Sequence, residues 1–313
     1  MSALWLACIA LASMASAHAA APLRVVIVLS ENGDAYTDVA NAIRDALGRD
    51  GGERFRVSVL VAERDAAALP SAGEEPGLLV TVGMRAASAV QQLSLRGPVL
   101  HTLVPKATLD KLLGAAASPK GLSKRSGIYL DQPLDRQLDL IRLIIPAATR
   151  VGVIYGPNSV KYANALELAA GAMGLKVEAE TVTGSEQVAV ALRRVLERGD
   201  VLLGLPDPEV FNQATVHNLL LAAYRSGDAV FAFSPAYVKA GALAGVFSTS
   251  AQIGTQAAEM ISKFVGQAAW PEPQYPKYFS VSVNRTVARS MGIPIEEERS
   301  LQEKLQNLAE ASN

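Results

Sequence analysis

Polar and aromatic side chains stand at the ends of several short apolar runs in this chain. The candidate ligand-binding residues are Ser30, Glu31, Asn32, Gly83, Met84, Thr102, Tyr129, Tyr155, Asp207 and Ser234. If the runs are parallel strands, their C-terminal ends share one edge of a sheet, which is where open α/β sheets bind ligands. The mixture of hydroxyls, an amide and two carboxylates favours an uncharged or zwitterionic organic solute. Asp207 suits a ligand amine, and helix N-termini suit a ligand carboxylate.

Several of these residues also have a purely structural interpretation. Ser30 and Ser234 are typical of strand ends and helix caps. Asp207, between two prolines, suits the N-cap of a helix that begins near residue 209. Gly83 is typical of a special backbone conformation. Both interpretations stay open at the level of sequence.

Motifs for catalysis or metal binding are not found. His101 and His217 lie far apart without metal-ligand spacing, and the nucleophile-elbow, phosphate-loop and zinc-helix motifs do not occur. Asp131 and Asp135 have helical i,i+4 spacing, but nearby Arg136 and Asp139 favour a solvated helix start. The sequence therefore predicts a protein that is not an enzyme and that holds no metal or cofactor.

Composition limits the class of partner. The chain has 313 residues, 50% of them hydrophobic, which is enough for two globular domains. The formal net charge is −1, and no stretch gathers Lys and Arg into the basic footprint that nucleic-acid binding requires. We expect a small-molecule solute as ligand and no nucleic acid.

The first 19 residues form an apolar segment that ends in Ala17-His18-Ala19, a typical signal-peptidase site. The alternative is an uncleaved anchor, although the apolar part is shorter than the roughly 20 residues of a membrane-spanning helix. Cys8, the single cysteine, lies in this segment, so the mature protein would contain no thiol. We expect secretion across the cytoplasmic membrane and a location in the periplasm.

Strands and helices alternate along the rest of the chain. Continuous apolar runs predict strands at 24–29, 55–61, 78–82 and 98–103, with helices between them. The pattern then restarts with strands at 151–155, 176–182, 200–205 and 229–233, including a helix over 209–225. Alternation of this kind predicts parallel sheets built from right-handed βαβ units. The fold class is therefore α/β, with two similar Rossmann-like lobes.

The last quarter of the chain is too short for a third lobe. Three crossings between the lobes, near 127–132, 245–250 and 279–284, would form a multi-strand hinge. The predicted division is a signal peptide at 1–19, an N-terminal lobe of 22–128 plus 248–280, and a C-terminal lobe of 129–247 plus 281–313. Leu301, Leu305 and Leu308 have helical spacing, typical of either a docked terminal helix or a frayed end.

Four segments carry a resemblance to a known family. They are Thr81–Ala89 (TVGMRAASA), the helix-and-strand pair 137–146 and 150–155, the pair 237–243 and 253–258, and the closing pair 279–284 and 288–294. Together they resemble the substrate-binding proteins of bacterial ABC importers, in the group related to tryptophan- and tyrosine-binding lipoproteins. The resemblance implies the type I periplasmic-binding fold, a membrane permease as partner and an aromatic amino acid as a plausible ligand.

The departures from the family pattern lie at the expected pocket. Ser30 to Gly33 replace a His-Pro-like loop, Leu103 to Ala107 replace an Asp-Pro-Val segment, and Met84 replaces a threonine. Asp207 keeps a position that is often acidic in the family. We therefore expect the solute-binding component of an ABC importer, with an orphan periplasmic receptor as the alternative.

Overall fold

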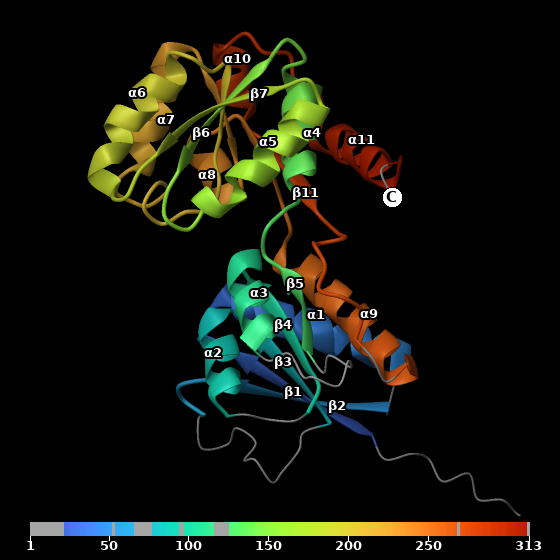
Figure 1. Ribbon diagram of the computed structural model, residues 1–313. Coiled ribbons are helices and arrows are strands. Elements are labelled where there is room, and N and C mark those ends of the chain that lie inside the picture. The colour runs from blue at the N-terminus through green and yellow to red at the C-terminus, as the bar shows by residue number, and fades with distance from the viewer. Residues whose placement is uncertain are drawn as a thin grey trace, which may run out of the picture.

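The computed structural model describes residues 22–51, 54–65, 77–93, 97–115, 125–267 and 270–311. The predicted signal peptide lies outside these residues. The described chain forms two α/β lobes, one above the other, with a narrow waist between them (Figure 1). The α/β fold class with two mostly parallel sheets is confirmed.

The N-terminal lobe is built on a five-stranded parallel sheet in the order β2-β1-β3-β4-β5. Its strands are β1 (Leu23–Leu29), β2 (Phe55–Val61), β3 (Leu78–Val82), β4 (Val99–Val104) and β5 (Arg125–Tyr129). Helices α1 (Asp34–Gly51) and α9 (Ser250–Gln267) cover one face, and α2 (Met84–Gln92) and α3 (Lys106–Ala115) cover the other. The central strands are continuously apolar because both faces of the sheet are buried.

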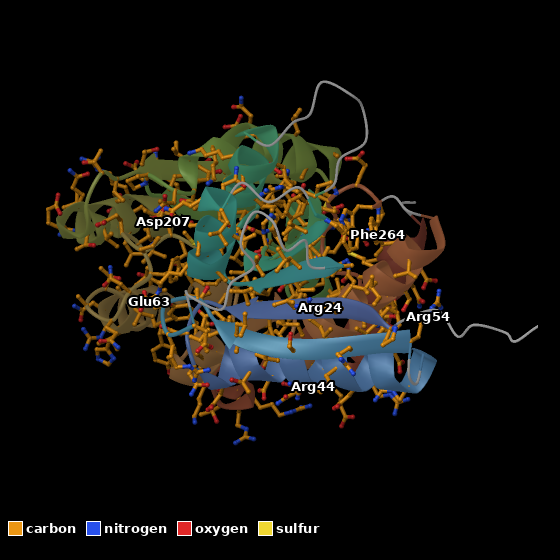
Figure 2. The ribbon with its side chains drawn as sticks, turned by 90° about the horizontal axis from the view of Figure 1, so that it is seen from below. Arg24, Arg44, Arg54, Glu63, Asp207 and Phe264 are labelled. Atoms are coloured by element: carbon orange, nitrogen blue, oxygen red, sulfur yellow. The ribbon has the colours of Figure 1, made fainter. Side chains whose placement is uncertain are left out.

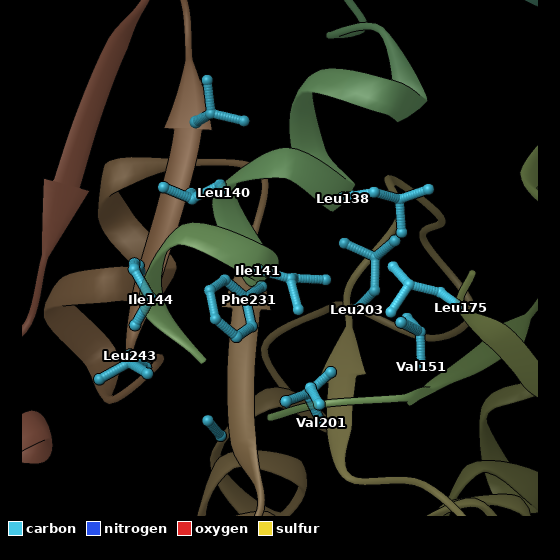
Figure 3. Packing of buried hydrophobic residues seen from close by; sticks show 14 of the residues in the cluster. Leu138, Leu140, Ile141, Ile144, Val151, Leu175, Val201, Leu203, Phe231 and Leu243 are labelled. Carbon is cyan, nitrogen blue, oxygen red and sulfur yellow. The ribbon is translucent and has the colours of Figure 1, made fainter. Parts of the chain in front are cut away.

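The C-terminal lobe is built on a six-stranded sheet in the order β11-β10-β9-β8-β6-β7. Its strands are β6 (Arg150–Tyr155), β7 (Lys176–Thr181), β8 (Val201–Leu203), β9 (Ala229–Ala232), β10 (Ala244–Phe247) and the antiparallel edge strand β11 (Ser280–Val283). Its helices are α4 (Leu134–Ile144), α5 (Ala163–Ala172), α6 (Val188–Leu196), α7 (Val216–Ser226), α8 (Pro235–Ala240), α10 (Arg285–Ser290) and α11 (Glu298–Ala311). The larger of its two cores packs α4 against strands β6, β8 and β9, with Phe231 near the centre (Figure 3).

The predicted tail helix is docked rather than frayed. Leu301 and Leu305 are each 1% exposed and join the core beneath α4 and β11. Burial of two leucines supplies the contact that holds a short terminal helix in place.

The predicted helix at 209–225 begins only at Val216, so its first half was wrong. Residues 208–215 form turns instead, because side chains bind their backbone locally. Asn212 accepts the N–H groups of Ala214 and Thr215 and donates to the carbonyl of Pro208. Short polar side chains that compete with the helical hydrogen bonds for backbone groups favour turns over helices.

Three chain segments cross between the lobes. The first is 130–133, between β5 and α4, and the second is 248–249, between β10 and α9. The third lies before its predicted span: Gln274 bridges Ile128 at the edge of the first sheet, and the chain enters β11 at Ser280. The crossings run side by side at the waist, so a rotation of the lobes would bend all three together.

Candidate functional site

A cavity of about 800 Å³ lies between the lobes, on the hinge side of the cleft. Its walls come from the exposed side of α1, the crossings, and the C-terminal ends of β8 and β9. The lining residues are Asp38, Asn41, Ala42, Asp45, Leu130, Asp131, Gln132, Leu134, Gln137, Tyr162, Leu205, Pro206, Phe233, Ser234, Pro235, Phe247, Ser248, Thr249, Ser250, Ala251 and Tyr275. This volume and this mixture of apolar walls with a few polar groups are typical of small-molecule sites.

The lining is acidic as well as apolar. Asp38, Asp45 and Asp131 contribute three carboxylates, and no lysine, arginine or histidine is among the lining residues of the described chain. Two tyrosines, two phenylalanines and several hydroxyls complete the walls. The cavity therefore offers carboxylates and aromatic faces, both of which favour a positively charged group.

Asp131 ties the two lobes together at the first crossing. Its Oδ2 accepts the backbone N–H of Lys106 in the N-terminal lobe at 2.6 Å, and its Oδ1 accepts the Tyr162 hydroxyl of the C-terminal lobe at 3.1 Å. Burial, followed by the charge of Asp131, raises the pKa of Tyr162, which keeps this hydroxyl a donor. The expectation that Asp131 belongs to a solvated helix start was wrong, because α4 begins only at Leu134.

A second network joins the crossings to one another. Gln132 donates from Nε2 to the Ser248 hydroxyl at 2.8 Å, and Ser248 donates to the carbonyl of Tyr278 at 2.6 Å. Arg136 donates to Gln132 Oε1 at 2.7 Å and to the carbonyl of Pro276 at 2.9 Å. Burial lowers the pKa of Arg136 to about 10, so it remains a cation at neutral pH. Each crossing is thus held by hydrogen bonds from another.

Gln137 lines the cavity, and the acceptor atom of its side chain is buried without a hydrogen-bond partner among the described residues. Its side chain is buried at 6% exposure and donates from Nε2 to the carbonyl of Gln132 at 3.3 Å. Its Oε1 atom is buried and has no hydrogen-bond partner among the described residues. A buried amide oxygen without a donor is costly, so this atom requires an explanation.

The N-terminal candidates from the sequence lie outside the cavity lining. Ser30 accepts the N–H of Ala86 at 3.0 Å and so holds the start of α2. Gly83 has φ 92°, the positive-φ conformation that its sequence position suggested. Met84 and Glu31 are exposed, with Glu31 paired to Arg85 at 2.6 Å.

The remaining two N-terminal candidates, Asn32 and Thr102, also lie outside the cavity lining. Asn32 is exposed, and Thr102 is fully buried with its hydroxyl donating to the carbonyl of Thr81 at 3.0 Å. Asn32 follows β1 and Thr102 lies within β4, and neither residue lines the cavity. The N-terminal lobe contributes α1 to the cavity instead.

Of the C-terminal candidates, Ser234 lines the cavity and Asp207 and Tyr155 do not. Ser234 also caps α8 by accepting the N–H of Tyr237 at 3.5 Å, so both of its proposed roles are compatible. Tyr155 is 2% exposed within the core, where burial raises its pKa to about 12. Tyr129, at the first crossing, is 7% exposed, and its hydroxyl donates to Asp110 at 3.2 Å.

Asp207, labelled in Figure 2, is fully engaged within its own lobe. Its Oδ2 accepts the N–H groups of Asn158 and Ser159 and the hydroxyl of Ser159, each at 2.9 Å. Its Oδ1 accepts the N–H of Glu209 at 3.0 Å, and the side chain is 3% exposed. These bonds join the loop after β6 to the loop after β8, which leaves little of the carboxylate for a ligand.

Sequence reasoning missed the residues on α1. Asp38, Asn41 and Asp45 stand on the side of the helix opposite Val39, Ile43 and Leu47, which enter the core. A polar helix face usually lies against solvent. This face lines a cavity only because the second lobe lies opposite it, and the sequence of α1 does not show the position of that lobe. Gln132 and Gln137 were missed because neither stands at the end of a predicted strand.

Two general features can be stated for the described part of the chain. It contains no cluster of three or more His, Cys, Asp or Glu residues that could hold a metal ion. No helix within it has the length and apolarity needed to cross a membrane.

Solved structures share the architecture. The chain aligns with a ligand-free, open substrate-binding protein, CD0873 from Clostridium difficile, at 21% identity and TM-score 0.71, covering 88% of this chain and 96% of that one. It aligns with an ABC domain in complex with L-Trp from Streptococcus pneumonia at 17% identity and TM-score 0.62, covering 90% and 98%. A conserved domain protein from Vibrio cholerae aligns at 24% identity and TM-score 0.60, covering 90% and 98%. At these identities the likeness concerns the fold.

Among curated protein sequences, no relative matches. The model of the family described as "ABC transporter substrate binding protein" matches residues 25–304, which is most of the chain. The recognition from sequence is confirmed, and the chain belongs to the ABC transporter substrate-binding protein family.

Proposed function

We propose that this protein is the solute-binding component of an ABC importer. It binds a small organic solute, an amino acid or related compound, in the cavity between its lobes and delivers it to a membrane permease. The observation that carries the proposal is the cavity of about 800 Å³ at the crossings, which is lined by apolar and aromatic side chains together with three carboxylates. Family membership supports a solute and a transporter as partners.

The arrangement of the crossings supports a closing motion. One lobe supplies α1, and the other supplies the ends of β8 and β9, so solute placed between them contacts both. Contacts made to both lobes favour the closed arrangement over the open one, and the hinge allows the change without unfolding either core. A closed, loaded form differs in shape from an empty one, which is what a permease must distinguish.

The periplasm is the proposed location, because the N-terminal 19 residues have the form of a signal peptide and the family model matches the chain that follows. Binding there requires no covalent chemistry. The proposed absence of catalysis is supported by membership of a substrate-binding family.

A thermal-shift screen tests the proposal. The mature protein is heated with amino acids, amines, nucleosides, sugars and short peptides, and hits are measured by calorimetry. A solute at 100 times its Kd adds about 2.7 kcal/mol to stability. A panel without any hit would count against a solute receptor.

Matched bulky substitutions locate the site. Asn41→Trp adds an indole to an exposed position of α1 that lines the cavity, and Met84→Trp adds one to an exposed position of α2 that does not. We expect Asn41→Trp to abolish binding of the best hit and Met84→Trp to leave it unchanged. The reverse result would place the site at the ends of β1 and β3 instead.

A further inference from the structure

On the basis of the proposed function, we infer that Tyr162 is a positioning residue that couples solute binding to the angle between the lobes. Its hydroxyl bonds to Asp131 and so holds the two walls of the cavity at the separation that a solute requires. Three features carry this role: the path of the bond from lobe to lobe, the fixed support behind each partner, and the place of both partners in the cavity wall.

The bond runs from one lobe to the other through the carboxylate of Asp131. One oxygen accepts the backbone N–H of Lys106, the first residue of α3 in the N-terminal lobe, at 2.6 Å. The other oxygen accepts the hydroxyl of Tyr162 in the C-terminal lobe at 3.1 Å. Lys161, next to Tyr162, adds the attraction of its charge to Asp131. We call Lys106, Asp131 and Tyr162 the lobe tie.

Asp131 moves with the N-terminal lobe although it lies on the first crossing. Leu130, the residue before it, donates its backbone N–H to the carbonyl of Val104 at 3.0 Å, and Asp131 itself holds Lys106. The bend of the first crossing therefore lies between Asp131 and the start of α4 at Leu134. The bond from Tyr162 spans this bend, so a rotation of the lobes lengthens or breaks it.

Tyr162 stands on a fixed support in the C-terminal lobe. It ends the short 3-10 helix η3 (Val160–Tyr162), which follows β6. Its N–H donates to the carbonyl of Ser159 at 2.9 Å, and Ser159 donates its N–H and its hydroxyl to Asp207, each at 2.9 Å. The buried carboxylate of Asp207 thus fixes the backbone from which Tyr162 extends. Because little freedom is lost when a residue on a fixed support forms a bond, most of the free energy of that bond acts on the lobes.

Other hydrogen bonds at the waist can follow a rotation of the lobes. Gln132 donates to Ser248, and Ser248 donates to the carbonyl of Tyr278, so this chain of bonds joins one crossing to another. Gln252, in the first turn of α9, donates to Ser280 at the start of β11 at 3.0 Å, and both residues adjoin crossings. The partners of these bonds lie on or next to the segments that bend, whereas Tyr162 lies beyond α4 and β6 in the chain.

The lobe tie is also part of the cavity wall. Tyr162 and Asp131 line the cavity, together with Asn41 of the N-terminal lobe and Ser234 of the C-terminal lobe. A solute that contacts both lobes needs these walls at their observed separation. When only a fraction of the empty molecules has that separation, the apparent Kd is the intrinsic Kd divided by this fraction. Tyr162 therefore increases affinity by raising the fraction, whatever the chemistry of the solute.

Single-molecule energy transfer on the empty mature protein is the first measurement. Dyes on Gln92→Cys in α2 and Leu168→Cys in α5 report the separation of the lobes, because both positions are exposed and residues 22–313 contain no other cysteine. We expect Tyr162→Phe to lower the fraction with the observed separation by at least twofold and up to about fivefold, with an unchanged urea midpoint. An unaltered fraction would overturn the inference.

Titrations then compare this fraction with affinity. The hits of the thermal-shift panel, beginning with tryptophan and tyrosine, are titrated into wild type and Tyr162→Phe by calorimetry. We expect each hit to lose affinity by the factor by which the fraction falls. Losses that differ between hits would mean that Tyr162 acts by direct contact with the solute, and a gain in affinity would mean that the lobe tie opposes binding. Either result contradicts the coupling role.

Tyr275→Phe is the matched control. Tyr275 lines the same cavity but stands on the third crossing, and its ring packs edge-on against Tyr129 at 5.0 Å, a contact that the variant keeps. We expect the distribution of lobe separations to stay as in wild type, whatever the effect on affinity. A shift as large as that of Tyr162→Phe would show that loss of any hydroxyl from this cavity loosens the lobes.

An Asp131→Ala background tests the partner of Tyr162. Asp131→Ala removes the acceptor of the Tyr162 hydroxyl. Tyr162→Phe should then produce no further change in the fraction, because the two substitutions remove the same bond. A further fall as large as that in the wild-type background would show that Tyr162 acts through another group.

The results separate the coupling role from the proposed function. If compounds bind and Tyr162→Phe changes neither the fraction nor their affinity, the solute receptor stands and the coupling role fails. If no compound of the panel binds the wild type, the proposed function fails and the coupling role fails with it.

Discussion

Two acidic residues near the cleft, Asp207 and Asp131, differ in what their carboxylates hold. Asp207 accepts four hydrogen bonds, all from its own lobe, and is 3% exposed. Asp131 accepts two, one from each lobe, and lines the cavity. Asp207 therefore serves the structure of its own lobe, whereas Asp131 lies among the groups that line the cavity. Position at a strand end did not distinguish the two.

The largest effect should come from Asp207→Ala. This change leaves three backbone N–H groups and the Ser159 hydroxyl without their acceptor, and we expect a loss of about 4 kcal/mol in the free energy of unfolding. Urea unfolding measures it. Glu197→Ala, at an exposed helix end, is the control and should change stability by less than about 0.5 kcal/mol. A stable Asp207→Ala protein that has lost solute binding would reverse the comparison.

Gly83→Ala tests the N-terminal strand ends in the same way. Gly83 has φ 92°, and a Cβ there would stand 2.5 Å from Ser30 Oγ and 2.6 Å from the Tyr36 ring. We expect a cost of about 3 kcal/mol from strain and overlap. Gly227→Ala, at φ 81° with open space around it, should cost about 1 kcal/mol from the backbone alone. Equal costs for the two variants would show that crowding at Ser30 is not the reason for this glycine.

Tyr162→Phe tests the hinge side. Loss of the hydroxyl removes the hydrogen bond that Asp131 accepts from the C-terminal lobe. We expect this bond to contribute about 1 kcal/mol, which corresponds to about a fivefold change in the ratio of open to closed molecules. Single-molecule energy transfer between dyes on the two lobes should report a broader, more open distribution, with global unfolding nearly unchanged. Tyr224→Phe, exposed on α7, is the control. An unaltered distribution in Tyr162→Phe would mean that Asp131 does not tie the lobes.

The smallest effect concerns Asp228, a partly buried carboxylate directly before the interior strand β9 and outside the cavity lining. Burial, and then the charge of Asp200, raises its pKa to about 6. Because the folded protein holds this proton more tightly than the unfolded chain, ionisation costs stability above pH 6, and the cost vanishes as the pH falls towards 4. Asp228→Asn should therefore add about 0.5 kcal/mol at pH 8, after allowance for solvent screening, and nothing at pH 4. A gain at both pH values would contradict the raised pKa.

The fold was largely predictable from the sequence, because buried parallel strands are continuously apolar and the helices carry apolar residues at helical spacing on one face. The runs at 24–29 and 151–155 illustrate this signal, and each became a central strand. The helix at 209–225 was misplaced because local bonds from Asn212 and Asp207 hold its first half in turns. Such bonds join residues that are close in sequence. They depend on side-chain geometry, which the hydrophobic periodicity of a sequence does not show.

The cavity was much less predictable. Its polar groups come from the solvent face of α1, from the crossings and from the first turn of α4, which meet only when the second lobe is in place. Asp131 had the sequence appearance of a solvated acid, and Asp207 that of a ligand contact, because spacing alone does not say which groups their oxygens bind. Ser234 was the one sequence candidate that also lines the described cavity.

A crystal structure of the protein with the tightest-binding solute of the screen tests the central claim most directly. We expect the solute between α1 and the crossings, in contact with both lobes through lining residues such as Asn41 and Ser234. Solute bound instead against Ser30, Gly83 and Asp207, with the hinge cavity left empty, would contradict the account.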